Sequence, residues 1–189
     1  DKIENTSGSI LFSLDDRFIF YSKLDENHRP KKIFRHEIGK SIKEDLLIFE
    51  ERTPAFTVSI GISADEKYYF INSSDHNTSE KYYFKSNENL PKPKIVRKRE
   101  KGIIYSVSSW GGYFYIHTNK GAEDFKIERS KDIEASEWGV FIPAKNETMI
   151  GGLTFLKDWI VRSELNNALD KIFVRDIKSN KEEELIFTD

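Results

Sequence analysis

The chain has 189 residues, with 30 Lys and Arg against 32 Asp and Glu, and a net charge of −2. This balance argues against a dedicated nucleic-acid binder and against an anchor on an anionic membrane, since both normally need a basic surface. No apolar run approaches the roughly 18 residues of a membrane-spanning helix, and no charged start precedes an apolar core as in a secretory signal. The absence of cysteine excludes internal disulfides and thiolate metal sites and fits a cytoplasmic protein.

Short runs of aromatic and β-branched residues, separated by Asp, Gly, Pro and Asn, extend along the whole chain and predict strands and turns. The predicted strands of the first half are 10–14, 18–21, 32–35, 46–50, 56–62, 68–71, 82–84 and 95–97. Those of the second half are 103–107, 113–116, 125–127, 138–142, 149–155, 159–161, 172–174 and 185–187. Only residues 41–46 and 132–137 could form a short helical turn.

Matching strand centres recur at Phe20, Phe70, Tyr115 and Val161, at intervals of 50, 45 and 46 residues. A period of roughly 40–50 residues with four strands per unit is typical of propeller blades. The predicted fold is therefore all-β: a partial β-propeller of about four blades, each with four antiparallel strands. We expect a single propeller segment over 1–189, with blades at about 8–53, 54–101, 102–146 and 147–189. A stacked β-sandwich also accommodates many short strands, but not so regular a period.

Four blades seldom close a ring by themselves. An unclosed stack leaves one apolar face open on each end blade, and each would exceed the few hundred Å² that single domains usually tolerate. The chain also begins at Asp1 rather than Met. We therefore expect it to pair with further blades or to be a segment of a longer protein.

Several short stretches together, in their order and spacing, match one known family from about Ser9 to the end of the chain. They are Phe20-Tyr21, Arg29-Pro30, 35–39, 47–51, Ser74-Asp75 with 78–80, 99–102 with Tyr105, 114–116 with 118–119, Trp138 with 141–143, and Phe155 with Asp158-Trp159. The chain resembles part of the propeller domain of the oligopeptidase B branch of the prolyl oligopeptidase family of serine peptidases.

The resemblance implies a seven-bladed parent propeller, which at this period needs roughly 330 residues. In this family the propeller covers an α/β-hydrolase domain, screens its active site and admits short peptides, and the oligopeptidase B branch cleaves after Arg and Lys. The expected partners are thus the hydrolase domain, the remaining blades in the same or a separate chain, and the parent's peptide substrates, with no nucleic acid, membrane or cofactor. The catalytic groups belong to the hydrolase domain, so the chain alone is not expected to be an enzyme.

No catalytic residue is assigned in the chain. The family nucleophile lies in a Gly-x-Ser-x-Gly-Gly turn between a strand and a helix. The nearest similar stretch is 109–112, but Val107 occupies the place of the leading glycine and a strand follows. Gly111-Gly112 is better explained as a hairpin turn, because glycine adopts the positive φ that tight hairpins need. His28, His36, His76 and His117 are all expected to be solvated or structural; His36 matches a propeller position of the family, which is not the catalytic base.

No metal ligand is assigned either. Asp75, His76 and Asn77 adjoin in one loop, where an Asx turn is the better interpretation. The carboxylate pairs Asp15-Asp16 and Asp65-Glu66 lie at hairpin turns and are expected to be solvated.

Two further features are expected to be structural. Lys92 to Lys101 is the densest basic stretch. Nucleic acid could use such a patch through phosphate contacts, but no aromatic residues interleave it, and we expect a charged rim between two blades. Arg97 and Arg99 could alternatively contact an acidic partner domain. Gly151-Gly152 indicates a bulge or close packing within a strand.

Three functional hypotheses remain. The first is the non-catalytic propeller part of an oligopeptidase B-like peptidase. The second is a stand-alone propeller module for protein interaction, or the product of a split or truncated peptidase gene. The third, a propeller enzyme acting on carbohydrates or nucleotides, lacks any clustered acid pair. The sequence does not assign a ligand-binding residue.

Overall fold

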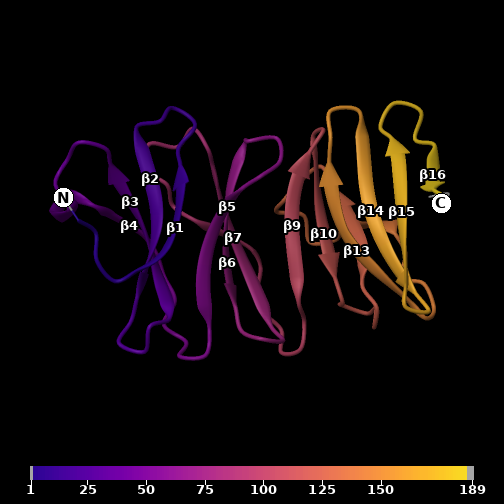
Figure 1. Ribbon diagram of the computed structural model, residues 1–189, viewed down its shortest axis with the longest axis horizontal. Coiled ribbons are helices and arrows are strands. Elements are labelled where there is room, and N and C mark those ends of the chain that lie inside the picture. The colour runs from indigo at the N-terminus through magenta and orange to yellow at the C-terminus, as the bar shows by residue number, and fades with distance from the viewer. Residues whose placement is uncertain (1, 187–189) are drawn as a thin grey trace. The chain divides into compact units, whose positions relative to one another are not determined.

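The computed structural model describes residues 2–186 and contains four antiparallel sheets of four strands each (Figure 1). We call these sheets the first to fourth blades. The first two blades comprise β1 (Thr6–Phe12), β2 (Phe18–Leu24), β3 (Pro30–Glu37), β4 (Leu46–Glu50), β5 (Thr57–Ile62), β6 (Tyr68–Ser74), β7 (Ser79–Lys85) and β8 (Lys94–Arg97). The other two comprise β9 (Tyr105–Trp110), β10 (Tyr113–Thr118), β11 (Lys126–Ser130), β12 (Gly139–Ile142), β13 (Thr148–Phe155), β14 (Trp159–Asn166), β15 (Leu169–Asp176) and β16 (Glu182–Leu185).

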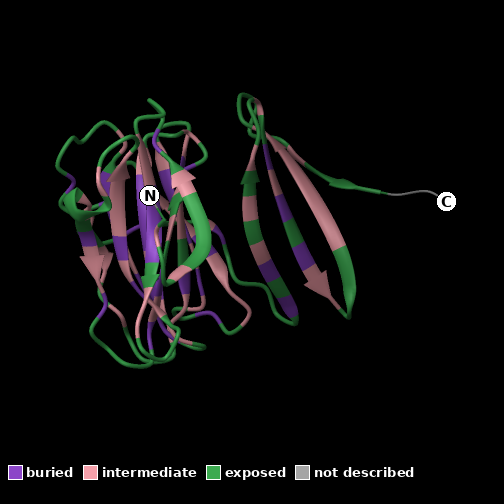
Figure 2. Ribbon diagram, turned by 60° about the vertical axis from the view of Figure 1, so that its left-hand side comes forward, coloured by how far each residue is buried: buried purple, intermediate pink, exposed green. Residues whose placement is uncertain are grey.

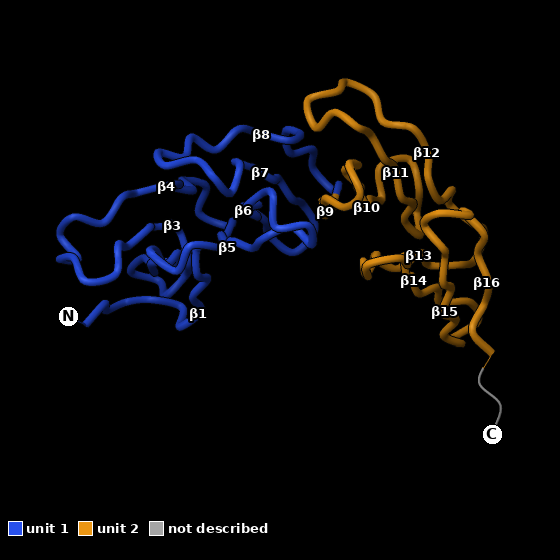
Figure 3. Tube along the Cα trace, turned by 90° about the horizontal axis from the view of Figure 1, so that it is seen from above, with its two compact units in different colours: residues 1–103 blue, residues 104–189 orange. Residues whose placement is uncertain are grey.

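Each blade is a simple meander in which every strand pairs with the next one along the chain. The chain divides into two compact units, Asp1–Ile103 and Ile104–Asp189, with two blades in each (Figure 3). Turns at the ends of the sheets are mostly exposed, and most buried residues lie within the strands (Figure 2). No helix in the described range 2–186 is long and apolar enough to cross a membrane. That residues 1–189 form one segment with the expected blade boundaries stays a prediction.

The prediction of four strands in each of four repeated sheets is confirmed, with shifts at some ends. The third blade begins at Tyr105, two residues later than expected, because residues 100–103 form a turn. The last strand, β16, begins three residues before the predicted range 185–187 and overlaps it at Leu185, while Phe187 lies outside the described residues. A short 3₁₀ helix, η1 (Ile42–Glu44), follows its N-cap Ser41 as expected. Residues 132–137 contain a hydrogen-bonded turn instead of a helix.

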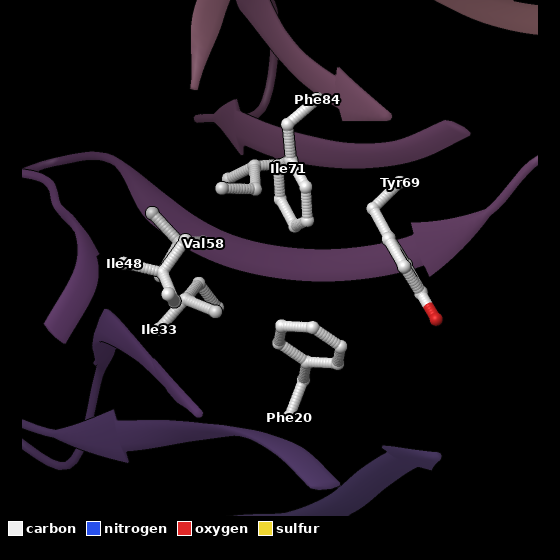
Figure 4. Close-up of a cluster of buried hydrophobic side chains, with 7 residues drawn as sticks. All are labelled: Phe20, Ile33, Ile48, Val58, Tyr69, Ile71 and Phe84. Carbon is white, nitrogen blue, oxygen red and sulfur yellow. The ribbon is translucent and has the colours of Figure 1, made fainter. Parts of the chain in front are cut away.

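The core of the first unit is formed by side chains from one face of each sheet. In β2 and β3, Phe20 and Ile33 point towards the second blade, where they meet Tyr69 and Ile71 of β6 and Phe84 of β7 (Figure 4). The Phe20 ring centroid lies 4.8 Å from that of Tyr69. Because side chains alternate between the faces of a strand, the neighbouring residues of β2 and β3 point away from the second blade.

The second unit repeats this plan between its own two blades. Tyr115, Ile127 and Ile142 of the third blade pack against Ile150 and Ile160 of the fourth. Each pair of blades therefore buries one apolar face of each sheet against its neighbour.

Candidate functional site: uncovered blade faces and charged contacts between blades

The first blade has a second apolar face that no described residue of another blade covers. Two rows across its strands point this way, since directly paired residues of an antiparallel sheet share a face. They are Ile10–Tyr21–Phe34–Leu47 and Phe12–Ile19–His36. Phe12 is 50% exposed and Ile10 57% exposed. We call this the first outer face.

A buried polar group lies on the same face. Asp45 accepts hydrogen bonds from the Tyr21 hydroxyl, at 2.7 Å, and contacts Nδ1 of His36 at 2.6 Å. Burial, followed by the bond to Asp45, raises the pKa of Tyr21 far above its ordinary value. His36 is thus tied to a carboxylate that orients it, and this pair matches the structural role expected from the sequence.

The fourth blade also presents an uncovered apolar face, the second outer face. Val161 and Val174 share a row across β14 and β15, and Ile172 pairs with Leu185 of β16. A groove over these strands is lined mainly by apolar side chains, including Trp159, which is 43% exposed. The expectation that both end blades expose apolar faces is therefore confirmed; what covers them stays a prediction.

Arg99 links the first and second blades through two carboxylates. Its Nη2 donates to Glu51, which follows β4, and to Glu80 of β7, at 2.7 Å each. Glu51 and Glu80 are almost wholly buried, and Arg99 lies 4.0 Å from the centroid of the Phe56 ring. For Arg99 this is the expected charged contact between two blades, and it argues against Arg99 as a free cation for a partner domain; a rim formed by the whole stretch 92–101 stays a prediction.

These contacts shift the acidities of the groups involved. Burial alone would raise the pKa of Glu51, but hydrogen bonds from Ser73, Arg99 and the Thr53 backbone outweigh it and lower the pKa to about 2. Burial alone would also raise the pKa of Glu80, but hydrogen bonds from Arg99 and Tyr82 outweigh it and lower the pKa. Both groups are therefore held as carboxylates at neutral pH.

We expect the stability of the first unit to fall in acid because of Glu51. Since the pKa of Glu51 in the fold is about 2, below its ordinary 4.5, its contribution is fully present above pH 4.5 and is lost between 4.5 and 2. Urea unfolding across this window should show a smaller loss in Glu51→Gln than in the wild type. Glu26→Gln, an exposed control, should leave the wild-type pH dependence intact; equal slopes in all three proteins would contradict the assignment.

Lys31, which the sequence analysis did not single out, is also buried between the first two blades. Its ammonium group donates to the backbone carbonyls of Thr53 at 2.6 Å, Pro54 at 3.0 Å and Phe56. The three carbonyls belong to the segment that leads into β5. Lys31 therefore fixes the connection between the blades. No local pattern in the sequence indicates which cation reaches this segment.

A similar charged cluster lies in the second unit. Arg162 of β14, which is 5% exposed, pairs with Glu164 and donates through Nη2 to Glu182 at 2.6 Å. Lys145 reaches Glu164 at 2.6 Å, and Nε of Arg175 reaches Glu182 at 2.9 Å. The cluster ties β14, β15 and β16 to the segment before β13. Its cations stand far apart in the sequence, so spacing could not predict it.

The remaining histidines have structural or solvent-facing positions. Nε2 of His117 lies 2.7 Å from the carbonyl oxygen of Ile150, and its ring stacks on Phe125 at 4.6 Å. Burial lowers the pKa of His117, with the bond to Ile150 opposing it, so the ring is neutral at pH 7. His28 and His76 are exposed in loops.

The acidic residues of the loops accept local hydrogen bonds. Asp75 forms the predicted Asx turn, accepting from the backbone N–H groups of Asn77 and Thr78. Asp15 and Asp65 each accept from a serine two residues earlier, at 2.6 and 2.8 Å. Within residues 2–186, no three His, Asp or Glu side chains gather where they could hold a metal ion.

The stretch 109–112 forms a hairpin, as predicted. Trp110 and Tyr113 pair across the turn, and Gly111 and Gly112 have φ values of 60° and 80°, which suit a two-residue turn. Ser109 lies inside β9 opposite Phe114, without the strand-to-helix geometry of a nucleophile turn. The basic stretch 92–101 includes β8 and the Arg99 contact already described.

Gly151 lies at the predicted bulge, where the register shifts between Ile150 and Leu153. A Cβ on Gly151 would lie 2.2 Å from Oγ of Ser163 and 2.8 Å from its backbone oxygen, whereas the space beside Gly152 is open. Gly151→Ala should therefore lower the free energy of unfolding by about 1–3 kcal/mol, as overpacking does. Gly152→Ala is the matched control in urea titrations. Equal costs for the two variants would show that the close approach does not constrain the strand.

Comparison with known proteins places this architecture in context. Residues 1–188 match the family model described as the N-terminal β-propeller domain of prolyl oligopeptidase. Oligopeptidase B from Trypanosoma brucei, in a closed form with covalently bound antipain, superimposes with a TM-score of 0.92 and 28% identity, covering 100% of this chain and 28% of that chain. The sandwich alternative is thereby excluded in favour of a propeller.

Two curated relatives give similar coverage. Protease 2 of Moraxella lacunata is 30% identical over 176 residues, which are 92% of this chain and 26% of that protein. Dipeptidyl aminopeptidase BI of Pseudoxanthomonas mexicana is 26% identical over 178 residues, 92% of this chain and 24% of that protein. The chain thus spans about a quarter of the length of these relatives.

Proposed function

Because the chain belongs to the family of prolyl oligopeptidase N-terminal β-propeller domains, we propose that it is the non-catalytic propeller part of an oligopeptidase B-like serine peptidase. In this proposal it covers the active site of a hydrolase domain and restricts entry to short peptides. The parent cleaves after Arg and Lys: the peptide acyl group passes to a serine nucleophile supplied by that domain as the amine leaves, and water then releases the acid.

The family match over residues 1–188 is the observation on which the proposal depends. The two outer faces support it, because a blade in a closed propeller has a neighbour on each side and these faces have none among the described residues. The charged contacts around Arg99 and Arg162 also support it. The Arg99 contacts join the first two blades, and the Arg162 cluster fixes the strands of the fourth blade, as a rigid screen requires.

The cleavage preference needs its own test, since a relative of similar coverage is named a dipeptidyl aminopeptidase. The full-length gene product should hydrolyse a fluorogenic peptide with Arg before the scissile bond, and a serine-reactive phosphonate should abolish this activity. The isolated chain should not hydrolyse it. Phosphonate-sensitive activity of the isolated chain would overturn the non-catalytic role, and a preference for another residue would overturn the assigned specificity.

The screening role predicts discrimination by substrate size. The full-length product should cleave a short Arg peptide but not the same sequence placed in a loop of a folded protein. The same protein in its unfolded form is the control, because it shows that the Arg bond of that sequence can be cleaved. Equal cleavage of the peptide and the folded protein would contradict the screening role.

A stand-alone interaction module, or one product of a split gene, is the second candidate, and the exposed second outer face is the observation that favours it. The flanking reading frame separates the two: further blades and a Gly-x-Ser-x-Gly turn support the peptidase. We also propose a cytoplasmic location, from the cysteine-free composition alone; cell fractionation tests it.

A further inference from the structure

A small crevice opens between the third and fourth blades, entirely within the second unit. Its volume is about 240 Å³. No acidic residue is among the described residues that line it. The side chains that dominate its walls are Trp110, Tyr113, Tyr115, Phe141, Arg129 and Arg175. The walls thus carry two guanidinium groups and no carboxylate, and only one of these cations, Arg175, has an ion-pair partner behind the wall.

Arg129, on β11, is the first of these cations. Its guanidinium carbon lies 4.8 Å from the centroid of the Tyr113 ring and 4.6 Å from that of Phe141. It is half-buried and pairs with no carboxylate in the described part of the chain. Arginine cannot shed its charge in a protein, and a partly desolvated guanidinium without a counterion is costly. One of its donors meets the Tyr115 hydroxyl in the crevice wall, and the remaining N–H groups of Arg129 are available to an anion.

Arg175, on β15 of the neighbouring blade, contacts the same Phe141 ring at 4.7 Å. It is held by Glu182 through Nε, at 2.9 Å, and by Asn180 through Nη1, at 3.1 Å. Two guanidinium groups thus converge on one aromatic ring from adjacent blades. Glu182 balances the charge of Arg175, which leaves Arg129 as the cation of the pair without a carboxylate partner among the described residues.

The third element is the entrance. Gly111 belongs to the two-residue hairpin between β9 and β10 and forms part of the crevice wall. A two-glycine turn has no side chain to cover the opening, whereas the corresponding turns of the first two blades are longer and carry charged residues. The glycine pair that forms the tight hairpin therefore also leaves this side of the crevice without a covering side chain.

We propose that this crevice is a carboxylate-binding site. Arg129 donates a bidentate pair of hydrogen bonds to the carboxylate, and Arg175 adds a second positive charge. The aromatic walls contact the apolar part of the ligand. The volume lies below the roughly 300–1,000 Å³ typical of drug-sized ligands, so the site suits a small organic acid or one terminal residue of a peptide.

The test uses the full-length gene product and ligand-observed ¹⁹F NMR, with 4-fluorophenylacetate as the probe. Its neutral analogue 4-fluorophenylacetamide has the same ring and nearly the same size. The acid should bind, and the affinity of the amide should be at least about tenfold lower. A hydrogen bond to a charged group changes an affinity by about tenfold or more. Equal binding of acid and amide, or no binding of the acid, would overturn the proposal.

Variants assign the site. Arg129→Gln should lower the affinity for 4-fluorophenylacetate about tenfold. Arg129→Lys retains the positive charge but not the two parallel donors of a guanidinium group. Its affinity for the acid should lie between those of the wild type and Arg129→Gln. Arg35→Gln is the matched control, because Arg35 also stacks on an aromatic ring, Phe18 at 4.1 Å, but in the first unit. Unchanged binding in both Arg129 variants would refute the assignment even if one of them folds poorly.

Competition against the bound probe distinguishes the two sources of the carboxylate. N-acetyl-Phe-Gly with a free C-terminus should displace the probe if the site takes peptide termini, and its C-terminal amide should not. Displacement by small aryl acids alone would assign the site to free metabolite-like acids. Displacement by both forms of the peptide would show that the carboxylate is not recognised, and would overturn the proposal.

Discussion

Arg99→Met should lower the free energy of unfolding of the first unit by about 3–5 kcal/mol, the cost of breaking a buried ion pair by removing one partner. The substitution retains much of the apolar stem over Phe56 but leaves Glu51 and Glu80 without their cation. These two carboxylates are 6% and 5% exposed, so water cannot replace the lost partner. Urea unfolding followed by hydrogen exchange in β7 and β8 measures the loss where it arises.

Two controls distinguish the cost of breaking the buried ion pairs from the cost of removing any arginine side chain. Arg52→Met removes a solvent-exposed cation that pairs with Glu50 at 3.5 Å, and should cost at most about 1 kcal/mol. Adding Glu51→Gln and Glu80→Gln to Arg99→Met should recover part of the stability, because the unpaired charges are then gone. An Arg99 variant no more costly than the Arg52 variant would mean that the carboxylates are not held by this cation.

The repeating architecture could be predicted because it depends on short sequence patterns of strand and turn residues. Strand centres such as Phe20 and Phe70 lie one blade apart, and the turn chemistry of Gly111-Gly112 requires a hairpin wherever the hairpin lies in the fold. The bulge at Gly151 was also visible, since a glycine inside a strand indicates close approach. Such features depend on a few consecutive residues, and their geometry is fixed before tertiary packing.

The charged contacts could not be predicted for the opposite reason. Arg99 belongs to a dense basic stretch in which every cation has the same local context, and only the fold selects one to meet Glu51, which is 48 residues away. Arg129 and Arg175 likewise converge on Phe141 only because two blades pack side by side. Sequence spacing identifies strands, but it does not identify which side chains meet across a blade interface.

Phe20→Ala and Phe12→Ala test the two faces of the first blade with the same change of side chain. Phe20 is 3% exposed and contacts Tyr69 and Phe84, so its truncation should cost about 3–5 kcal/mol in any context. Phe12 is 50% exposed on the first outer face. In the isolated chain its truncation should therefore cost much less, because half of the ring is already in water.

The full-length gene product gives the informative contrast. If a further blade covers the first outer face, Phe12 becomes buried there, and Phe12→Ala should then approach the cost of Phe20→Ala. Hydrogen exchange of the β1 and β2 amides reports this locally, which avoids assigning one unfolding free energy to a protein of several domains. A Phe12 variant that stays nearly neutral in the full-length product, while the Phe20 variant remains costly, would show that this face has no apolar neighbour. The proposal that the chain continues a larger propeller on that side would then fail, because an uncovered apolar face of this kind is what the missing blades are proposed to bury.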